Sequence, residues 1–139
     1  GCAEDLFLNR LQAERHPEFG QLGRLRVSAH VLVDRRGAVT QFVPFGLRAW
    51  HAGVSSYQGR AQCNDFSIGI ELEGTDLVPY AHEQYRVLAD LISCLRNYYP
   101  EIVADAVVGH EHVAPGRKTD PGPAFDWKLL RCLIQDTTP

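Results

Sequence analysis

The positions of hydrophobic residues along the chain predict its two clearest elements. In residues 66–74 (FSIGIELEG) every second side chain is apolar, a pattern typical of a strand with one buried face. Glu71 and Glu73 then share the opposite face, two residues apart. Residues 82–99 instead carry apolar side chains three and four positions apart. That spacing predicts an amphipathic helix that ends before Pro100.

Weaker versions of the same two patterns predict the remaining elements. In chain order they are a helix at 2–13, a strand at 26–34, a hairpin turn at 35–37, a strand at 38–44, a short strand at 106–109 and a final helix capped by Asp126. Residues 16–23 and 46–65 are expected to form loops, and a loop as long as the second is commonly functional. This mixture of strands and helices predicts an α/β fold in which a mixed β-sheet is flanked by α-helices.

Composition and charge limit the functions open to the chain. Its length suits one domain, which we expect to span residues 1–139. The net charge of -3 gives no electrostatic basis for binding nucleic acid or an anionic membrane. No apolar run in the sequence approaches the roughly 20 residues that a membrane-spanning helix requires. We therefore expect neither a nucleic-acid nor a membrane partner.

The cysteines suggest the cellular compartment of the protein, and the lack of methionine suggests that a segment precedes residue 1. Cys2, Cys63, Cys94 and Cys132 are scattered without metal-type spacing, and the last two fall in helical patterns. We favour buried free thiols, which indicate a reducing, cytoplasmic location. The alternative is a lipoprotein, which would need a signal sequence before Cys2. Because the chain has no methionine, we also expect a segment upstream of residue 1.

Residues 109–122 (GHEHVAPGRKTDPG) carry the strongest signal of chemistry. The segment sets His110, Lys118 and Asp120 on one stretch stiffened by proline and glycine. Imidazole and carboxylate are both good zinc ligands, and a lysine beside a metal can stabilise an oxyanion. A hydrogen-bonded loop histidine with a turn-forming aspartate remains the alternative. Glu71 and Glu73 are both candidates for a general base that deprotonates water.

The other histidines and two aromatic residues give weaker signals. For His30, His51 and His112, a satisfied structural histidine is favoured over a metal ligand. Trp50 and Tyr57 can stack on a sugar or a peptide, although packing beneath the long loop is the safer interpretation.

Five segments between about Arg26 and Trp127 follow one another in a characteristic order. They are VSAH (27–30), QFVPF (41–45), RAWHAGVS (48–55), CNDFSIGIELEG (63–74) and GRKTDPGP (116–123). Taken together, they resemble the zinc-dependent N-acetylmuramoyl-L-alanine amidases that act on anhydro-muropeptides. The resemblance covers most of the chain. It implies a mixed sheet flanked by helices, a fold shared with peptidoglycan recognition proteins.

The resemblance also implies an activity and assigns residues to it. The reaction is hydrolysis of the amide bond between N-acetylmuramic acid, in its 1,6-anhydro form, and L-alanine, for cell-wall recycling by a cytoplasmic monomer. His110 and Asp120 would bind Zn²⁺, Glu71 would be the general base in preference to Glu73, and Lys118 would stabilise the transition state. Arg26, Trp50 and His51 are expected to bind the muropeptide.

Three departures from the family pattern qualify these assignments. The first zinc ligand of the family, a histidine ending an early strand, has no counterpart in residues 1–139, so we expect it upstream of residue 1 and the domain to be truncated. His112 stands where the family usually has Asn or Asp. Gln62 stands where related enzymes can carry an arginine for the peptide carboxylates, which gives Arg26 more of that task. The alternative function is a non-catalytic muropeptide-binding module without a complete zinc site.

Overall fold

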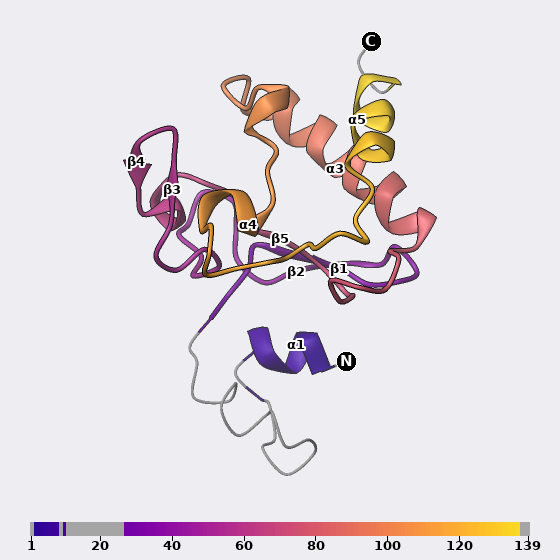
Figure 1. Cartoon of the computed structure of the whole chain (residues 1–139), viewed down its shortest axis with the longest axis horizontal. Helices are drawn as coiled ribbons and strands as arrows, with labels where there is room; N and C mark the ends of the chain where they lie inside the picture. Colours follow the sequence, from indigo (N-terminus) through magenta and orange to yellow (C-terminus); the bar gives the residue numbers. More distant parts are fainter. Residues whose placement is uncertain (1, 9, 11–26, 137–139) are drawn as a thin grey trace. The chain divides into compact units, whose positions relative to one another are not determined.

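The computed structural model describes residues 2–8, 10 and 27–136 (Figure 1). Its chain forms two compact units. Unit 1 comprises residues 1–32 and 39–73, and unit 2 comprises residues 33–38 and 74–139. Arg26, the predicted loop at 16–23 and residues 9 and 11–13 of the predicted first helix lie outside the described residues. The first half of that helix is present as α1 (Cys2–Phe7).

The three predicted strands of unit 1 are all present, but each is shorter than its hydrophobic pattern. They are β1 (Val31–Val33, whose last residue belongs to unit 2), β2 (Val39–Gln41) and β5 (Ile70–Leu72), in the sheet order β2-β1-β5. The carbonyl of Gly69 accepts from both His30 N and Val31 N, at 3.0 and 3.3 Å. Since one acceptor serves two donors here, the regular ladder is interrupted and begins only after His30.

The predicted strand at 66–74 is shortened for a second, local reason. Residues Cys63–Asp65 form a 3-10 helix (η2), and Phe66 closes it by donating its N–H to the Cys63 carbonyl. The Ser67 hydroxyl donates to the same carbonyl at 2.6 Å. These local bonds compete with strand pairing, so the alternating pattern becomes a strand only from Ile70.

The predicted long loop at 46–65 contains a hairpin that the sequence pattern did not reveal. Strand β3 (Ser56–Tyr57) pairs antiparallel with β4 (Arg60–Ala61). Gln58 and Gly59, which join them, both have positive φ, at 48° and 82°. A two-residue turn with this geometry usually has Asn, Asp or Gly at its first position. Because Gln58 stands there instead, the sequence does not indicate a hairpin turn.

In unit 2 the predicted turn at 35–37 is confirmed. Asp34 N donates to Ala38 O at 2.9 Å and Gly37 N donates to Asp34 O at 3.0 Å. The carboxylate of Asp34 also accepts from the backbone N–H groups of Arg36 and Ala38, each at 2.8 Å. Gly37 has a φ of 82°, which glycine adopts without strain.

Two helices form the core of unit 2. α3 (His82–Tyr98) packs against α5 (Trp127–Asp136), as Figure 1 shows. Gln84 is fully buried, accepts from Ala81 N at 3.0 Å and donates to Val33 O at 3.2 Å. The predicted cap of α5 is confirmed, because Asp126 Oδ1 accepts from Leu129 N at 2.9 Å. The buried side chains on the two helices include Tyr85, Leu88, Ile92, Leu95, Leu130 and Ile134.

Three predictions about unit 2 are wrong. Cys94 and Cys132 were predicted to be buried; they are free thiols but exposed. Cys94 lies two residues after the buried Ile92, and Cys132 two residues after the buried Leu130. Two residues turn a helix by about 200°, so both thiols point away from the buried face. The predicted strand at 106–109 is absent. A 3-10 helix (η3, Ala104–Ala106) stands at its start, and the backbone N–H groups of Ala106 and Val107 donate to the carbonyls of Val103 and Ala104 instead of to another strand. The predicted loop at 109–122 begins with a short helix, described below.

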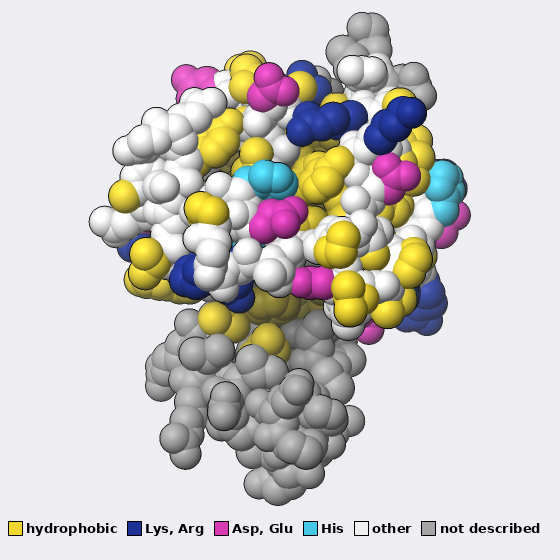
Figure 2. Space-filling view, in the orientation of Figure 1, with side chains coloured by type: hydrophobic (Ala, Val, Ile, Leu, Met, Phe, Trp, Pro, Cys, Tyr) yellow, Lys and Arg dark blue, Asp and Glu magenta, His cyan; other side chains and the backbone are white. Residues whose placement is uncertain are grey.

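The surface of unit 2 is mixed in character. Over α5 and the neighbouring segments, Lys, Arg, Asp and Glu side chains are interspersed with hydrophobic ones (Figure 2). Among the described residues, no helix is long and apolar enough to cross a membrane.

Candidate metal and catalytic site

His110 and Asp120 lie side by side in unit 2. Nδ1 of His110 is 3.0 Å from Oδ2 of Asp120. The imidazole is 16% exposed and the carboxylate 42%, so the pair lies at the edge of the protein, where a ligand can reach it. On the other side of the ring, Nε2 of His110 is 3.5 Å from the Arg117 guanidinium. The sequence prediction that this segment brings an imidazole and a carboxylate together is confirmed as geometry.

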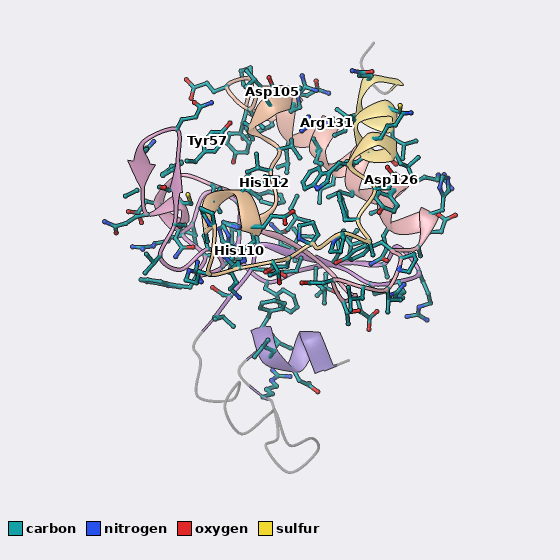
Figure 3. All side chains as sticks on the ribbon, viewed as in Figure 1. Tyr57, Asp105, His110, His112, Asp126 and Arg131 are labelled. Atoms are coloured by element: carbon teal, nitrogen blue, oxygen red, sulfur yellow. The ribbon has the colours of Figure 1, made fainter. Side chains whose placement is uncertain are left out.

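A short helix, α4 (His110–Val113), presents His110 (Figure 3). Its first turn is closed by His112, whose Nδ1 accepts from Gly109 N at 2.9 Å. Because Nδ1 of His112 is occupied by a backbone donor and its ring packs edge-on against Trp127, the favoured structural interpretation of His112 holds. The backbone of α4 also holds the second candidate ligand, since Glu111 N donates to Asp120 O at 3.0 Å.

The environment of Asp120 keeps it ionised. The hydrogen bond with His110 is the main cause that lowers the pKa of Asp120, and the positive charge of Lys118 lowers it further. These effects outweigh partial burial, which acts in the opposite direction. Lys118 itself is exposed. Asp120 therefore offers a carboxylate rather than a carboxylic acid at neutral pH, and that is the form that binds metal ions.

Residues of a preceding segment support the Asp120 turn, and the sequence reasoning did not find them. The hydroxyl of Thr119 donates to Oδ2 of Asp76 at 2.5 Å, and Asp76 O accepts from Ala124 N at 3.1 Å. The Tyr80 hydroxyl donates to Pro121 O at 3.2 Å. Burial raises the pKa of Tyr80, and the charges of Asp76 and Asp120 add to the shift, so the hydroxyl keeps its proton.

The donor set of this pair fits zinc. Two ligands of a tetrahedral zinc ion, with bonds of about 2.0–2.2 Å, lie roughly 3.3 Å apart. His110 Nδ1 and Asp120 Oδ2 are close to that separation without any rearrangement of the chain. Within the described ranges, no group of three or more His, Cys, Asp and Glu side chains is arranged to hold a metal ion. The described residues thus offer His110 and Asp120 as two candidate ligands.

The remaining predicted site residues belong to unit 1, except for Arg26, which lies outside the described residues. Glu71 is the middle residue of β5 and is half-buried. Glu73 lies beyond the end of β5 and is exposed. Of the two candidate bases, Glu71 therefore has the more constrained backbone.

Trp50 presents an aromatic surface that a neighbouring ion pair holds in place. The residue is 54% exposed, and the Arg48 guanidinium lies 3.9 Å from the centre of a Trp50 ring. Arg48 in turn forms a salt bridge with Asp65 at 3.0 Å. A planar cation stacked on an indole limits the orientations of both side chains. Sequence reasoning identified Trp50 but missed Arg48 and Asp65.

His51 is anchored by its backbone and packed by its ring. Oδ1 of the buried Asn64 accepts from His51 N at 3.1 Å and from Ala52 N at 2.8 Å. The imidazole lies edge-on to His30, with 5.6 Å between ring centres. Its role in substrate binding stays a prediction.

Comparison with known proteins places the chain in a family. The family model described as N-acetylmuramoyl-L-alanine amidase matches residues 2–123. The chain is 56% identical over 129 residues to the 1,6-anhydro-N-acetylmuramyl-L-alanine amidase AmpD of Salmonella typhimurium, covering 93% of this chain and 68% of that protein. It is 54% identical over 133 residues to AmpD of Escherichia coli, covering 96% and 72%.

Solved structures agree with the sequence matches. A selenomethionine derivative of AmpD superimposes with a TM-score of 0.92 at 53% identity, covering 96% of this chain and 74% of that one. The Escherichia coli amidase AmiD, solved with its substrate, gives a TM-score of 0.72 at 34% identity, covering 84% and 51%.

These matches define an amide hydrolase: the chain belongs to the N-acetylmuramoyl-L-alanine amidase family and is an enzyme of that class. Within the family it resembles the AmpD proteins, and both the predicted family and the predicted mixed α/β fold are confirmed.

Proposed function

We propose that the protein is a zinc-dependent amidase of peptidoglycan recycling. It hydrolyses the amide bond between N-acetylmuramic acid, in the 1,6-anhydro form, and L-alanine. The names of the AmpD relatives support this bond as the target. The AmpDh3 protein of Pseudomonas aeruginosa, 35% identical, was solved with an anhydromuramic pentapeptide, and AmiD with an anhydro-N-acetylmuramic acid peptide.

The observation that carries the zinc proposal is the 3.0 Å approach of His110 Nδ1 to Asp120 Oδ2. These two residues would hold the ion, with a further ligand from outside the described residues. Bound zinc supplies Lewis acidity, which polarises a carbonyl and makes water a better nucleophile at neutral pH. Because the Asp120 carboxylate is ionised at neutral pH, the proton that zinc would displace is the one that His110 Nδ1 donates to it.

Other residues of the chain would transfer the proton, stabilise the oxyanion and bind the substrate. Glu71 takes a proton from the attacking water and returns it to the departing amine of L-alanine. Lys118 places its ammonium group against the oxyanion of the tetrahedral intermediate. Arg26, Trp50 and His51 bind the muropeptide; the exposed indole of Trp50 suits the apolar face of a sugar ring.

We also propose that the protein acts in the cytoplasm as a monomer. Cys63, Cys94 and Cys132, the cysteines whose side chains the structure describes, are free thiols, which suits a reducing compartment. Cell fractionation and light scattering test the two proposals. Recovery in the periplasm, or the mass of a dimer, would contradict them.

The reaction is tested by product analysis. The full-length, zinc-loaded protein is incubated with 1,6-anhydro-N-acetylmuramyl-L-alanyl-γ-D-glutamyl peptide, and the products are identified by mass spectrometry. We expect free anhydro-N-acetylmuramic acid and a peptide that begins with L-alanine. Binding of the substrate without any cleavage would instead support the muropeptide-binding module.

A further inference from the structure

The buried imidazole of His30 joins two segments of unit 1. Only 1% of the residue is exposed. Its Nδ1 accepts from Gly69 N at 3.0 Å, so this nitrogen carries no proton. The other nitrogen, Nε2, therefore carries the proton and donates it to Leu47 O at 2.9 Å. Both ring nitrogens of a neutral histidine are thus satisfied by backbone groups.

Gly69 is held on more than one side. Besides its N–H, its carbonyl accepts from His30 N at 3.0 Å. A Cβ at this position would lie 2.3 Å from Cγ of His51, so only glycine fits against that ring. Since β5 begins at the next residue and is only three residues long, the bonds to Gly69 anchor the backbone where it enters the strand.

The second ring nitrogen acts on a different part of the site. Leu47, whose carbonyl accepts this bond, lies three residues before Trp50. Trp50 is itself hydrogen-bonded to Ser28, two residues before His30: Trp50 N donates to Ser28 Oγ at 2.9 Å, and Ser28 N donates to Trp50 O at 3.1 Å. The Nε2 bond thus holds the segment that carries Trp50 and His51, while the Nδ1 bond holds the strand that carries Glu71.

We propose that His30 is a positioning residue with two separable tasks. Its Nδ1 fixes Gly69 and, through it, the Glu71 carboxylate for proton transfer, and its Nε2 fixes the segment that binds the muropeptide. The proposal rests on the proposed function, in which Glu71 is the base and Trp50 contacts substrate. It predicts that the two nitrogens affect different kinetic constants: loss of the Nδ1 acceptor lowers kcat, and loss of the Nε2 donor raises KM.

Two substitutions separate the two nitrogens. In His30→Asn the side-chain oxygen can occupy the place of Nδ1, whereas in His30→Gln the terminal amide can occupy the place of Nε2. Amidase kinetics are measured on the full-length, zinc-loaded protein. We expect His30→Gln to lower kcat at least about tenfold and to keep KM within about threefold. We expect His30→Asn to raise KM at least about tenfold and to keep kcat within about threefold. Equal kcat losses in both variants, or none in either, would overturn the proposal.

A spectroscopic measurement keeps the test independent of activity. In the unsubstituted protein, ¹⁵N NMR is expected to show His30 protonated at Nε2 and a through-hydrogen-bond coupling from the Gly69 amide to Nδ1. Exchange of the Gly69 amide with solvent should accelerate in His30→Gln and stay slow in His30→Asn. A proton on Nδ1 of His30 would overturn the proposal even where the variants fail to fold.

A Glu71→Gln variant separates failure of this proposal from failure of the proposed function. If Glu71→Gln turns over at the unsubstituted rate, Glu71 is not the base, and the role given to His30 falls with it. If Glu71→Gln is inactive while His30→Asn and His30→Gln show the same kcat, only the proposal for His30 is overturned.

Discussion

Asp120 is bound to the first turn of α4 twice, by its carboxylate at His110 Nδ1 and by its carbonyl at Glu111 N, each at 3.0 Å. The two candidate ligands are therefore brought together by the folding of the chain itself. A site preformed in this way loses little conformational entropy when a metal binds.

Gly122 is expected to be essential for the turn that carries Asp120. Its φ is 78°, and a Cβ there would lie 2.4 Å from Cβ of Asp76. Gly122→Ala combines left-handed backbone strain with a steric overlap, so we expect it to lower the free energy of unfolding by about 2–4 kcal/mol. The matched control is Gly46→Ala, because nothing lies within 4 Å of a Cβ at Gly46. Similar urea midpoints for the two variants would contradict the structure.

The turn at Asp34 is expected to make stability depend on pH. Hydrogen bonds from the backbone of Ala38 and from Arg36 lower the pKa of Asp34 below its ordinary value of 3.8. A carboxyl with a depressed pKa in the folded protein stabilises it fully above the unfolded pKa, and this contribution is lost as the pH falls through the folded pKa.

Asp34→Asn isolates this contribution, because the amide cannot ionise. We expect the variant to unfold at lower urea than the unsubstituted protein at pH 7 and to show a smaller difference at about pH 2.5, because protonation of the Asp34 carboxylate increases as the pH falls below 3.8. Asp90→Asn, at an exposed position of α3, is the control and should change little at either pH. A deficit of the same size at both values of pH would rule out the carboxylate charge as its cause.

Lys118 is expected to act on the reaction rather than on folding. Its side chain is exposed, so Lys118→Ala should leave the melting temperature unchanged. Loss of an ammonium group that stabilises the oxyanion is expected to lower kcat at least about tenfold. Lys128→Ala, which removes an exposed lysine of α5, should keep the unsubstituted kcat. If the two variants have equal kcat, Lys118 has no part in the transition state.

The fold could be predicted where the signal was long and periodic. α3 was predicted to within one residue because its seventeen residues repeat one pattern. The β3–β4 hairpin was missed because Gln58 occupies a position that turn statistics assign to other residues. α4 was missed because a four-residue helix closed by His112 is too short for a periodic pattern.

The candidate site could be predicted only where its residues are close in sequence. His110 and Asp120 stand ten positions apart on one segment, so their proximity could be inferred from the chain. Asp76 supports Thr119 from 43 positions away, and His30 binds Gly69 from 39 positions away. Pairings at that distance depend on tertiary folding, and no local pattern in a single sequence encodes them.

The central claim, that His110 and Asp120 hold a catalytic zinc ion, is tested most directly by zinc affinity. Affinity is measured by competition with a chelator in the full-length protein, alongside amidase activity of the same samples. We expect His110→Ala and Asp120→Ala to weaken zinc binding at least about 100-fold and to abolish turnover. The controls His82→Ala and Asp90→Ala, at exposed positions of α3, should leave both unchanged. Unaltered zinc affinity in His110→Ala would contradict the account.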